Sequence, residues 1–310
     1  MIDKLEFLIT LSRERHFGRA AESCGVSQPT FSAGIKQLED SLGVLLVERG
    51  SRFRSFTPEG ERVLDWARRI VSDARAMRQE IDALKHGLAG HLRIAAIPTA
   101  LPIVAMLTTP YQSNHPDVRF TILSRTSIQI LNMLENLEID AGLTYLDNEP
   151  LGRVQSFPLY TEHYRLLASP DGPLANRDSV TWKEVGHMPL CLLTPDMQNR
   201  RIIDAQLRAV GSDTVPRLES DSVIVLIAHV RTGKWTSVMP ARLAEVLGVT
   251  RDVRTIPIIE PVVTHSIGLV VPHRNPLTPL ISALVAEAKP FVPGLEEIGA
   301  LNGLPENMDV

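Results

Sequence analysis

The sequence has 310 residues, of which 44% are hydrophobic and 22% are charged, and its formal net charge is −4. A chain of this length exceeds the size at which one hydrophobic core keeps growing, so we expect two or three cores in an ordinary globular protein. A protein that coats nucleic acid indiscriminately is usually strongly basic, so any contact with DNA must be local.

Membrane insertion and secretion are not expected. No stretch approaches the roughly 18 uninterrupted apolar residues of a membrane span, and the first residues lack the apolar run of a signal peptide. We therefore expect a cytoplasmic protein. Cys24 and Cys191 are far apart, with no second ligand nearby, so we expect reduced core thiols and neither a disulfide nor a metal site. The sequence indicates no cofactor.

Three short helices and a basic hairpin are predicted within residues 1–57. The third helix should begin after Ser27, a serine cap followed by proline in the first turn, and stop at Gly43. Its apolar residues recur at spacings of three and four and should point inward. The opposite face carries hydrogen-bonding side chains: Gln28, Thr30, Ser32, Lys36 and Gln37.

A long helix is predicted over residues 58–89, beginning at Thr57-Pro58-Glu59. Its apolar residues alternate at intervals of four and three, which is a heptad pattern that favours a homodimer over a helix packed only on its own domain. The pattern consists of Val63, Ala67, Ile70, Ala74, Met77, Ile81, Leu84 and Leu88.

Alternating strands and helices are predicted from residue 90 to 292, which is the signature of an α/β domain with parallel strands. The clearest strands are 92–97, 118–123, 141–145, 164–168, 190–193 and 266–271, and the clearest helices are 223–231 and 277–288. Residues 293–310 are rich in Gly, Pro, Asn and Glu, and we expect them to form a loose tail.

The N-terminal motifs resemble those of LysR-type transcriptional regulators. They are Phe17-Gly18-Arg19-Ala20-Ala21, Val26-Ser27-Gln28-Pro29-Thr30-Phe31-Ser32, Ile35-Lys36-Gln37-Leu38-Glu39 and Thr57-Pro58-Glu59-Gly60. The resemblance implies a winged helix-turn-helix at 1–57, a dimerisation helix at 58–89 and an effector domain at 90–292 like type 2 periplasmic binding proteins. It implies lobe I at 91–162 plus 266–292, lobe II at 163–265, and a homotetramer.

The resemblance also implies a double-stranded DNA operator with an imperfect inverted repeat. Gln28 and Thr30 suit base edges in the major groove, while Pro29 and Ser32 lie beside them and Lys36 suits the backbone. Arg49, Arg52 and Arg54 on the predicted wing suit phosphates or the minor groove. Many relatives have a basic residue and then Gln or His where this chain has Ala33 and Gly34, so a phosphate contact is expected to be absent here.

The expected effector is a small anion or carboxylate bound between the two lobes. In two-lobed binders the ligand lies where strands end and helices begin, because free helix N–H groups attract anions. The candidates at such junctions are Thr99, Ala100, Thr126, Ser127, Thr144, Thr194, Asn199 and Ser222. Plain helix capping is the alternative for each hydroxyl. Trp235 could narrow the cleft, with Lys234 or Arg200 pairing the charge, or it could be ordinary core packing.

Two other function classes fit poorly. The sequence contains no GxSxG, HExxH, P-loop or GxGxxG motif, so we do not expect an enzyme. A solute-binding protein of the same α/β fold without a DNA-binding role would explain the C-terminal lobes and leave the helix-turn-helix motif unexplained.

Overall fold

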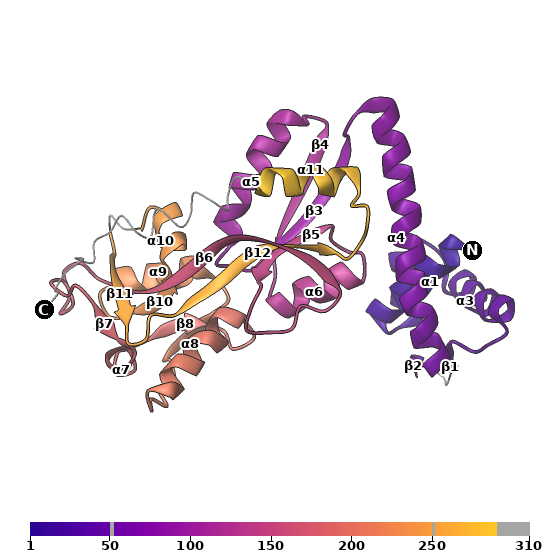
Figure 1. Cartoon of the computed structure of the whole chain (residues 1–310). Coiled ribbons are helices and arrows are strands. Elements are labelled where there is room, and N and C mark those ends of the chain that lie inside the picture. Colours follow the sequence, from indigo (N-terminus) through magenta and orange to yellow (C-terminus); the bar gives the residue numbers. More distant parts are fainter. Residues whose placement is uncertain (50–52, 250–251, 290–310) are drawn as a thin grey trace, which may run out of the picture. The chain divides into compact units, whose positions relative to one another are not determined.

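The computed structural model describes residues 1–49, 53–249 and 252–289. They form two compact units (Figure 1). The first comprises Met1–Ala89 together with Asn132–Glu138 and Thr278–Leu280, and the second contains the remaining described residues. The expected loose tail at 293–310 lies outside the described residues, as does Arg52. In the described part of the chain, no helix combines the length and hydropathy needed to cross a membrane.

The N-terminal part of the first unit contains α1 (Ile2–Glu14), α2 (Phe17–Ser23), α3 (Gln28–Leu42) and the antiparallel pair β1 (Val47–Arg49) and β2 (Phe53–Phe56). Buried Leu8, Leu11, Phe31 and Ile35 belong to its core. The apolar spacing of the third helix predicted that Ile35, Leu38 and Leu42 point inward; Ile35 and Leu38 are buried, but Leu42 at the end of α3 is 42% exposed. Helix α2 begins at Phe17, and the ring of the preceding His16 accepts hydrogen bonds from the free N–H groups of Gly18 and Arg19.

Helix α4 (Pro58–His86) begins directly after its N-cap residue, Thr57. The Thr57 hydroxyl accepts the Gly60 N–H at 2.9 Å and donates to the Leu45 carbonyl at 2.7 Å, so one side chain joins the helix start to the preceding segment. A Cβ atom on Gly60 would lie 2.0 Å from the Leu46 carbonyl oxygen. Glycine at this position therefore allows the helix to approach the segment before β1 closely.

The second unit consists of two lobes. Lobe I is built on the parallel strands β3 (Gly90–Ala96), β4 (Val118–Ser124) and β5 (Ala141–Tyr145), in the order β4-β3-β5. Its helices are α5 (Leu101–Asn114), α6 (Ser127–Glu135) and α11 (Pro279–Ala288), although the end of α6 and the start of α11 are grouped with the first unit. Asn114 of α5 donates to Glu287 of α11 at 2.9 Å, so these two helices lie side by side.

Lobe II contains β8 (Cys191–Leu193) and β9 (Leu218–Ser220), which pair in parallel. Its other elements are β7 (Val180–Thr181), α7 (Trp182–Val185), α8 (Gln198–Ala209), α9 (Val223–Arg231), β10 (Ser237–Pro240), α10 (Ala241–Val246) and β11 (Arg254–Ile259). Strands β10 and β11 pair with β6, and β7 pairs in parallel with β11.

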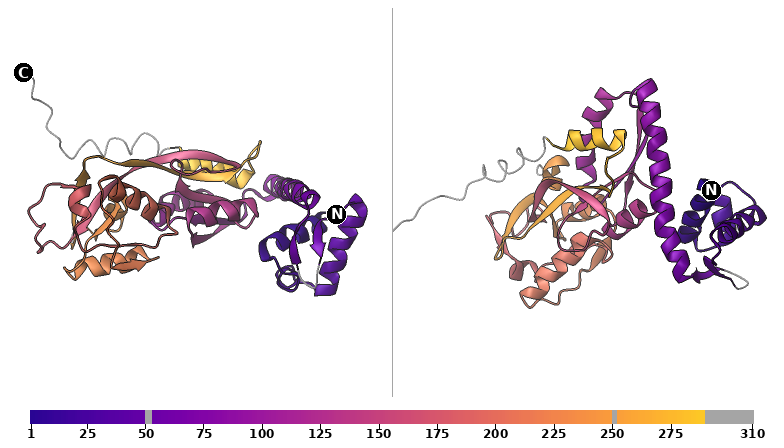
Figure 2. Two further views of the ribbon diagram at one scale, coloured as in Figure 1. Left: turned by 90° about the horizontal axis from the view of Figure 1, so that it is seen from below. Right: turned by 45° about the vertical axis from the view of Figure 1, so that its right-hand side comes forward.

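Two long antiparallel strands, β6 (Val154–Ala168) and β12 (Thr264–Pro272), run from one lobe to the other (Figures 1 and 2). The first part of β6 pairs with β12 in lobe I, and its last residues pair with β10 and β11 in lobe II. The sheet is therefore mixed, whereas the sequence pattern suggested parallel strands. The prediction also found only the end of β6, since Pro158 argues against a central strand. Pro158 is tolerated because residues 154–163 of β6 pair with β12 alone, so that their other side is a sheet edge.

Candidate DNA-binding surface and effector site

Helices α2 and α3 are joined by a short turn, which is the arrangement of a helix-turn-helix. At the start of α3, Gln28, Pro29 and Thr30 are exposed, and Lys36 is exposed farther along, whereas Ser32 is half-buried. These positions are accessible to a nucleic acid. The Ser27 hydroxyl accepts the Thr30 N–H and lies 2.8 Å from the Thr30 hydroxyl, so the cap also fixes one candidate side chain.

Ala33 and Gly34, the two departures from the family pattern, lie on different sides of α3. Ala33 is exposed, so a longer side chain could extend into solvent there. Gly34 is buried, and a Cβ atom on it would meet the Phe7 ring at 2.8 Å. The Phe7 and Phe31 rings stack at a centroid distance of 4.8 Å. Gly34 therefore serves the packing of α3 on α1.

The predicted wing is the β1–β2 hairpin. Arg54 is exposed on β2. Arg52 lies outside the described residues, and only the backbone of Arg49, at the end of β1, is described. Phe53 and Phe56 are half-buried and contact each other edge to face at 5.2 Å, and both pack against the core of the first unit. These two rings therefore support the hairpin.

Helix α4 has one covered face and one exposed apolar face. Leu64, Ala67 and Val71 are buried, and the helix contacts α1. We call the exposed apolar residues of α4 the α4 stripe. It consists of Trp66, Ile70, Met77, Ile81 and Leu84, which are 42–84% exposed. The heptad pattern included four of these five residues, but it also included Ala67, which belongs to the covered face.

The candidate effector residues of lobe I gather at one edge of its sheet. The Ile97 N–H donates to the Leu143 carbonyl, and the Arg125 N–H donates to the Ala96 carbonyl, so the carboxyl ends of β5, β3 and β4 are neighbours. Four candidates follow the ends of β3 and β4, and the fifth lies near the end of β5. They are Thr99, Ala100, Thr126, Ser127 and Thr144, all of which are buried.

Their hydroxyl groups differ in what they contact. Thr126 and Gln129 exchange hydrogen bonds between side chain and backbone, which is local capping of α6. The Ser127 hydroxyl accepts from Arg201 at 3.4 Å. The hydroxyl oxygens of Thr99 and Thr144 are buried and have no hydrogen-bond partner among the described residues.

The candidates of lobe II share the equivalent edge of the β8–β9 pair. The Thr194 N–H donates to the Ser220 carbonyl at 3.2 Å, and Ser222 precedes α9 directly after β9. The Thr194 hydroxyl is another buried oxygen that lacks a partner within the described ranges. Asn199 lies in the first turn of α8 and is 4% exposed.

Hydrogen bonds join the first turns of α8 in lobe II to the segment after β5 in lobe I. Asn199 donates to the Tyr145 hydroxyl at 3.3 Å, and Gln198 donates to the Asp147 carbonyl at 3.3 Å. Arg201 forms an ion pair with Glu149 at 2.7 Å. Gln198 and Arg201 lie in the same turns of α8 as Asn199, and neither of them was among the residues predicted from the sequence.

Trp235 is half-buried, packs against the lobe II core and contacts the His229 ring. It lines a pocket together with Ser169, Leu174 and Lys234, and the described residues of that pocket include none of the other effector candidates. Arg200 is also engaged elsewhere, because it pairs with Asp204 and Glu219 at 2.7 and 2.6 Å. Trp235 and Lys234 therefore line a pocket without the threonine candidates, whereas Arg200 donates to the carbonyl of Leu193, the residue before Thr194, at 2.8 Å.

A buried acidic cluster, which sequence reasoning missed, lies where β6 and β12 cross between the lobes. Glu162 is 1% exposed and accepts hydrogen bonds from the Tyr145 hydroxyl at 2.8 Å and the Tyr160 hydroxyl at 3.5 Å. The Tyr164 hydroxyl donates to Tyr145 at 3.3 Å. Burial raises the pKa of Glu162 to about 8, and it raises the pKa of each of the three tyrosines well above 10.

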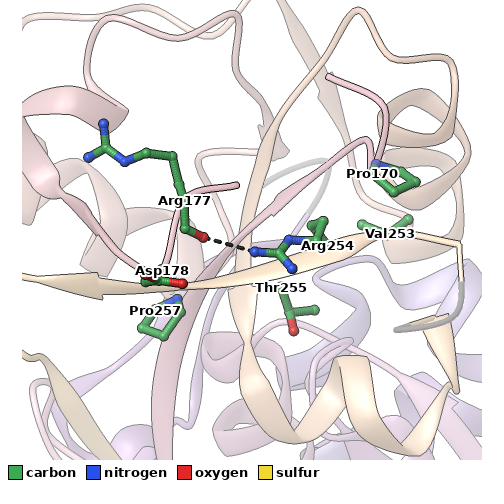
Figure 3. Close-up of a pocket in the computed structure, with 7 residues that line it drawn as sticks. All are labelled: Pro170, Arg177, Asp178, Val253, Arg254, Thr255 and Pro257. Atoms are coloured by element: carbon green, nitrogen blue, oxygen red, sulfur yellow. Dashed lines mark hydrogen bonds between the residues drawn. The ribbon is translucent and has the colours of Figure 1, made fainter. Parts of the chain in front are cut away.

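A surface pocket of about 270 Å³ lies on lobe II beside β11 (Figure 3). The Arg254 guanidinium donates to the Arg177 carbonyl at 2.9 Å, and the Arg177 side chain turns away from it and pairs with Glu184. Both cations are thus engaged. Within the described residues, no group of three or more His, Cys, Asp or Glu side chains could hold a metal ion.

Two family profiles match this chain. The one described as bacterial regulatory helix-turn-helix protein, lysR family, matches residues 2–61, and the one described as LysR substrate binding domain matches residues 85–291. The chain belongs to the LysR family of DNA-binding transcriptional regulators.

Curated LysR-type relatives match along most of their length. The DNA-binding transcriptional dual regulator OxyR of Escherichia coli strain K12 is 30% identical over 277 residues, which are 89% of this chain and 90% of the relative. The hydrogen peroxide-inducible genes activator of Haemophilus influenzae is 28% identical over 300 residues, which are 95% of this chain and 99% of the relative. The relatives named here are regulators of transcription.

Solved LysR-type structures share the architecture. A full-length OxyR variant from Pseudomonas aeruginosa superposes with a TM-score of 0.72 at 28% identity, covering 93% of this chain and 94% of that one. Full-length CbnR in complex with its target DNA superposes with a TM-score of 0.58 at 18% identity, covering 94% and 99%. The second likeness concerns the fold alone.

Proposed function

We propose that this LysR-type regulator binds an operator as a homodimer paired through α4, within a homotetramer, and that a small anion or carboxylate bound between the lobes switches its output. Such a protein acts in the cytoplasm, where the chromosome lies, and it has no catalytic role of its own. The two lobes of the second unit form the switch, and the helix-turn-helix forms the DNA contact.

The DNA-binding half of the proposal rests on the exposed start of α3. In a helix-turn-helix the second helix enters the major groove with its N-terminal residues against the base edges. Gln28 pairs with a base there and Thr30 offers its methyl group to thymine, while Lys36 and Arg54 contact phosphates. Because a dimer with twofold symmetry presents two such helices, the operator is an imperfect inverted repeat.

The α4 stripe supports the proposed dimer. Five large apolar side chains exposed along one helix face form the kind of patch that marks a protein interface. Residues that recur at intervals of three and four suit an antiparallel or parallel helix pair, with a second copy of α4 as the partner.

One observation carries the effector half of the proposal. The hydroxyl oxygens of Thr99, Thr144 and Thr194 are buried without partners inside the described ranges. Thr144 lies near the end of β5, and Thr99 and Thr194 each lie between a strand and the helix that follows it. Buried polar atoms are nearly always hydrogen-bonded, so these three hydroxyls indicate a polar ligand that would satisfy them. Helix N-termini at the same edges favour a negative charge on that ligand.

A peroxide signal, which the names of several relatives mention, is the alternative. Thiol sensing needs a reactive thiolate, and this chain has two cysteines. Cys191 is buried in β8, and burial raises the pKa of its thiol to about 11. Cys24 is half-buried in the helix-turn-helix, at the end of α2. The Cys191 thiol is therefore a poor nucleophile, and Cys24 lies outside the two lobes that we propose as the switch.

The two halves need separate tests. Thermal-shift measurements with formate, acetate, oxalate and phosphate, and with formamide and acetamide as neutral controls, should give a concentration-dependent rise in Tm for at least one anion. A gel shift with the DNA upstream of the protein's own gene should show a complex at low salt. A rise in Tm with the amides alone would overturn the proposal that the effector is an anion. The absence of a complex in the gel shift would overturn DNA binding at that site.

A further inference from the structure

The guanidinium group of Arg201 is held by a carboxylate of the other lobe. Its Nε donates to Oε1 of Glu149 at 2.7 Å, and its Nη2 donates to Oε2 at 2.8 Å. This two-point geometry is the one by which arginine recognises any carboxylate. The remaining N–H groups also have partners, since Nη1 donates to the Asp196 and Pro195 carbonyls and Nη2 also contacts the Ser127 hydroxyl.

The pair joins the two edges that carry the effector candidates. Arg201 lies in the first turns of α8 in lobe II, and its guanidinium contacts the hydroxyl of the candidate Ser127 in lobe I at 3.4 Å. Glu149 lies in the segment that follows β5, the strand that carries Thr144. Both side chains of the pair are 30% exposed, so a dissolved anion can reach them.

The surroundings allow Arg201 to hold one carboxylate and not two. Glu149 takes up the side-on pair of guanidinium donors, Nε and Nη2, and the acidic Asp147 lies two residues away in the same segment, next to His265 at 2.9 Å. A second anion added to this arrangement would meet like charge at close range. An anion can therefore gain Arg201 only by replacing Glu149.

We propose that Glu149 is an internal stand-in for the effector, occupying the anion-binding Arg201 until a small carboxylate takes its place. This inference rests on the proposed function and names the charged anchor of that site. The exchange removes the ion pair between the lobes and leaves the hydrogen bonds of Gln198 and Asn199 in place. The effector thereby changes the connection between the lobes without unfolding either of them.

The decisive variant is Glu149→Gln, because it keeps the size of the side chain and removes its charge. We expect the full-length variant to bind the anions that stabilise the wild type at least 10-fold more tightly by calorimetry, since the internal competitor is weakened. Arg201→Gln should reduce the affinity for the same anions at least 10-fold. Acetamide and formamide should show no such changes with either variant.

Asp204→Asn provides the matched control. It removes a carboxylate from the neighbouring Arg200 within the same helix, and that pair lies wholly in lobe II. Anion affinity should stay within about twofold of the wild type. If the wild type binds an anion but Glu149→Gln binds it no more tightly, the exchange is wrong and the anion effector stands. If neither protein binds any anion of the panel, both the exchange and the anion effector are wrong.

Hydrogen exchange gives a second readout that does not depend on a variant. Adding the anion that stabilises the wild type should speed amide exchange in the segment 147–150, because Glu149 loses its partner. Unchanged or slower exchange there, together with demonstrated binding, would show that Glu149 stays on Arg201 and would overturn the proposal.

Discussion

Single residues at the start of α3 serve either the helix or the DNA. The Ser27 hydroxyl accepts the Thr30 N–H, and proline in the first turn costs no hydrogen bond, so the helix start is fixed locally. Gln28 makes no such contribution to the cap and is exposed. Its side chain is therefore available for base recognition.

We expect Gln28→Ala to relax sequence preference and Arg54→Ala to weaken binding to all sequences alike. A good base contact contributes about 1–3 kcal/mol of discrimination, whereas a phosphate contact carries no sequence information. Competition gel shifts with the operator and with single-base variants of it should separate the two effects. Equal losses on operator and random DNA for Gln28→Ala would contradict the assignment.

Glu162 is a residue whose charge depends on its burial. Its carboxyl lies between tyrosine hydroxyls, and burial, reinforced by the nearby negative charge of Asp147, raises its pKa from 4.5 to about 8. The folded protein therefore holds this proton more tightly than the unfolded chain does. The sign follows directly: the contribution to stability is complete below about pH 4.5 and is lost as the pH rises through 8.

Replacing Glu162 by Gln should remove this pH dependence, since the amide imitates the protonated acid. The free energy of unfolding in urea should fall by several kcal/mol between pH 5 and 8.5 in the wild type, because one pKa unit corresponds to about 1.4 kcal/mol. In the variant this fall should be absent. Parallel curves for the two proteins would mean that Glu162 is ionised without cost in the folded state.

At the scale of elements, α4 divides its surface between its own unit and a partner. Leu64, Ala67 and Val71 pack inward, and Thr57 and Gly60 fix where the helix begins. The α4 stripe faces solvent in the single chain. Mutations on the two faces should therefore act on different properties of the protein.

Gly60→Ala should destabilise the helix-turn-helix unit by about 1–3 kcal/mol, because the added methyl group would collide with the Leu46 carbonyl. Denaturant unfolding monitored by circular dichroism would measure this loss. Glu61→Ala, an exposed change in the same turn, should stay within about 0.5 kcal/mol of the wild type. Equal stability of the two variants would contradict the close approach of α4 to the segment before β1.

Ile81→Asp should separate the dimer while leaving the fold intact, because a carboxylate on the α4 stripe would be buried against an apolar partner. Sedimentation should show a lower oligomeric state at micromolar concentration. Arg78→Asp changes more charge at an exposed position outside the stripe and should keep the oligomer. If both variants behave as the wild type does, the helix pair lies elsewhere.

Local signals predicted some elements well and others poorly. Ser27, Pro29 and Gly43 mark the two ends of α3, and the structure confirms both. Strand β6 was found only from 164 onward, since Pro158 interrupts the strand pattern and polar residues occupy positions 155–156 and 161–163. A position at the sheet edge is a tertiary property, and single-sequence patterns do not contain it.

For the whole molecule, the sequence indicated where the candidate effector site lies in the fold, but it did not indicate which side chains contact each other there. Strand ends pointed to Thr99, Thr144 and Thr194, because parallel strands bring their carboxyl ends together, and their role in effector binding stays a prediction. The pair of Glu149 with Arg201 could not be predicted in this way. These residues lie 52 positions apart, and only the crossing of β6 and β12 and the placement of α8 bring them into contact.

The crossing strands also make lobe II an insertion. His163 and Thr264, which lie at the two ends of the lobe II range 163–265, are direct partners across β6 and β12. A two-residue Asn-Gly turn is the connection that suits such a pair. Joining His163 to Thr264 in this way should yield a shorter regulator whose lobe I keeps its sheet, whose DNA contact persists and whose response to anions is gone. The same two positions could be used to insert a different ligand-binding lobe.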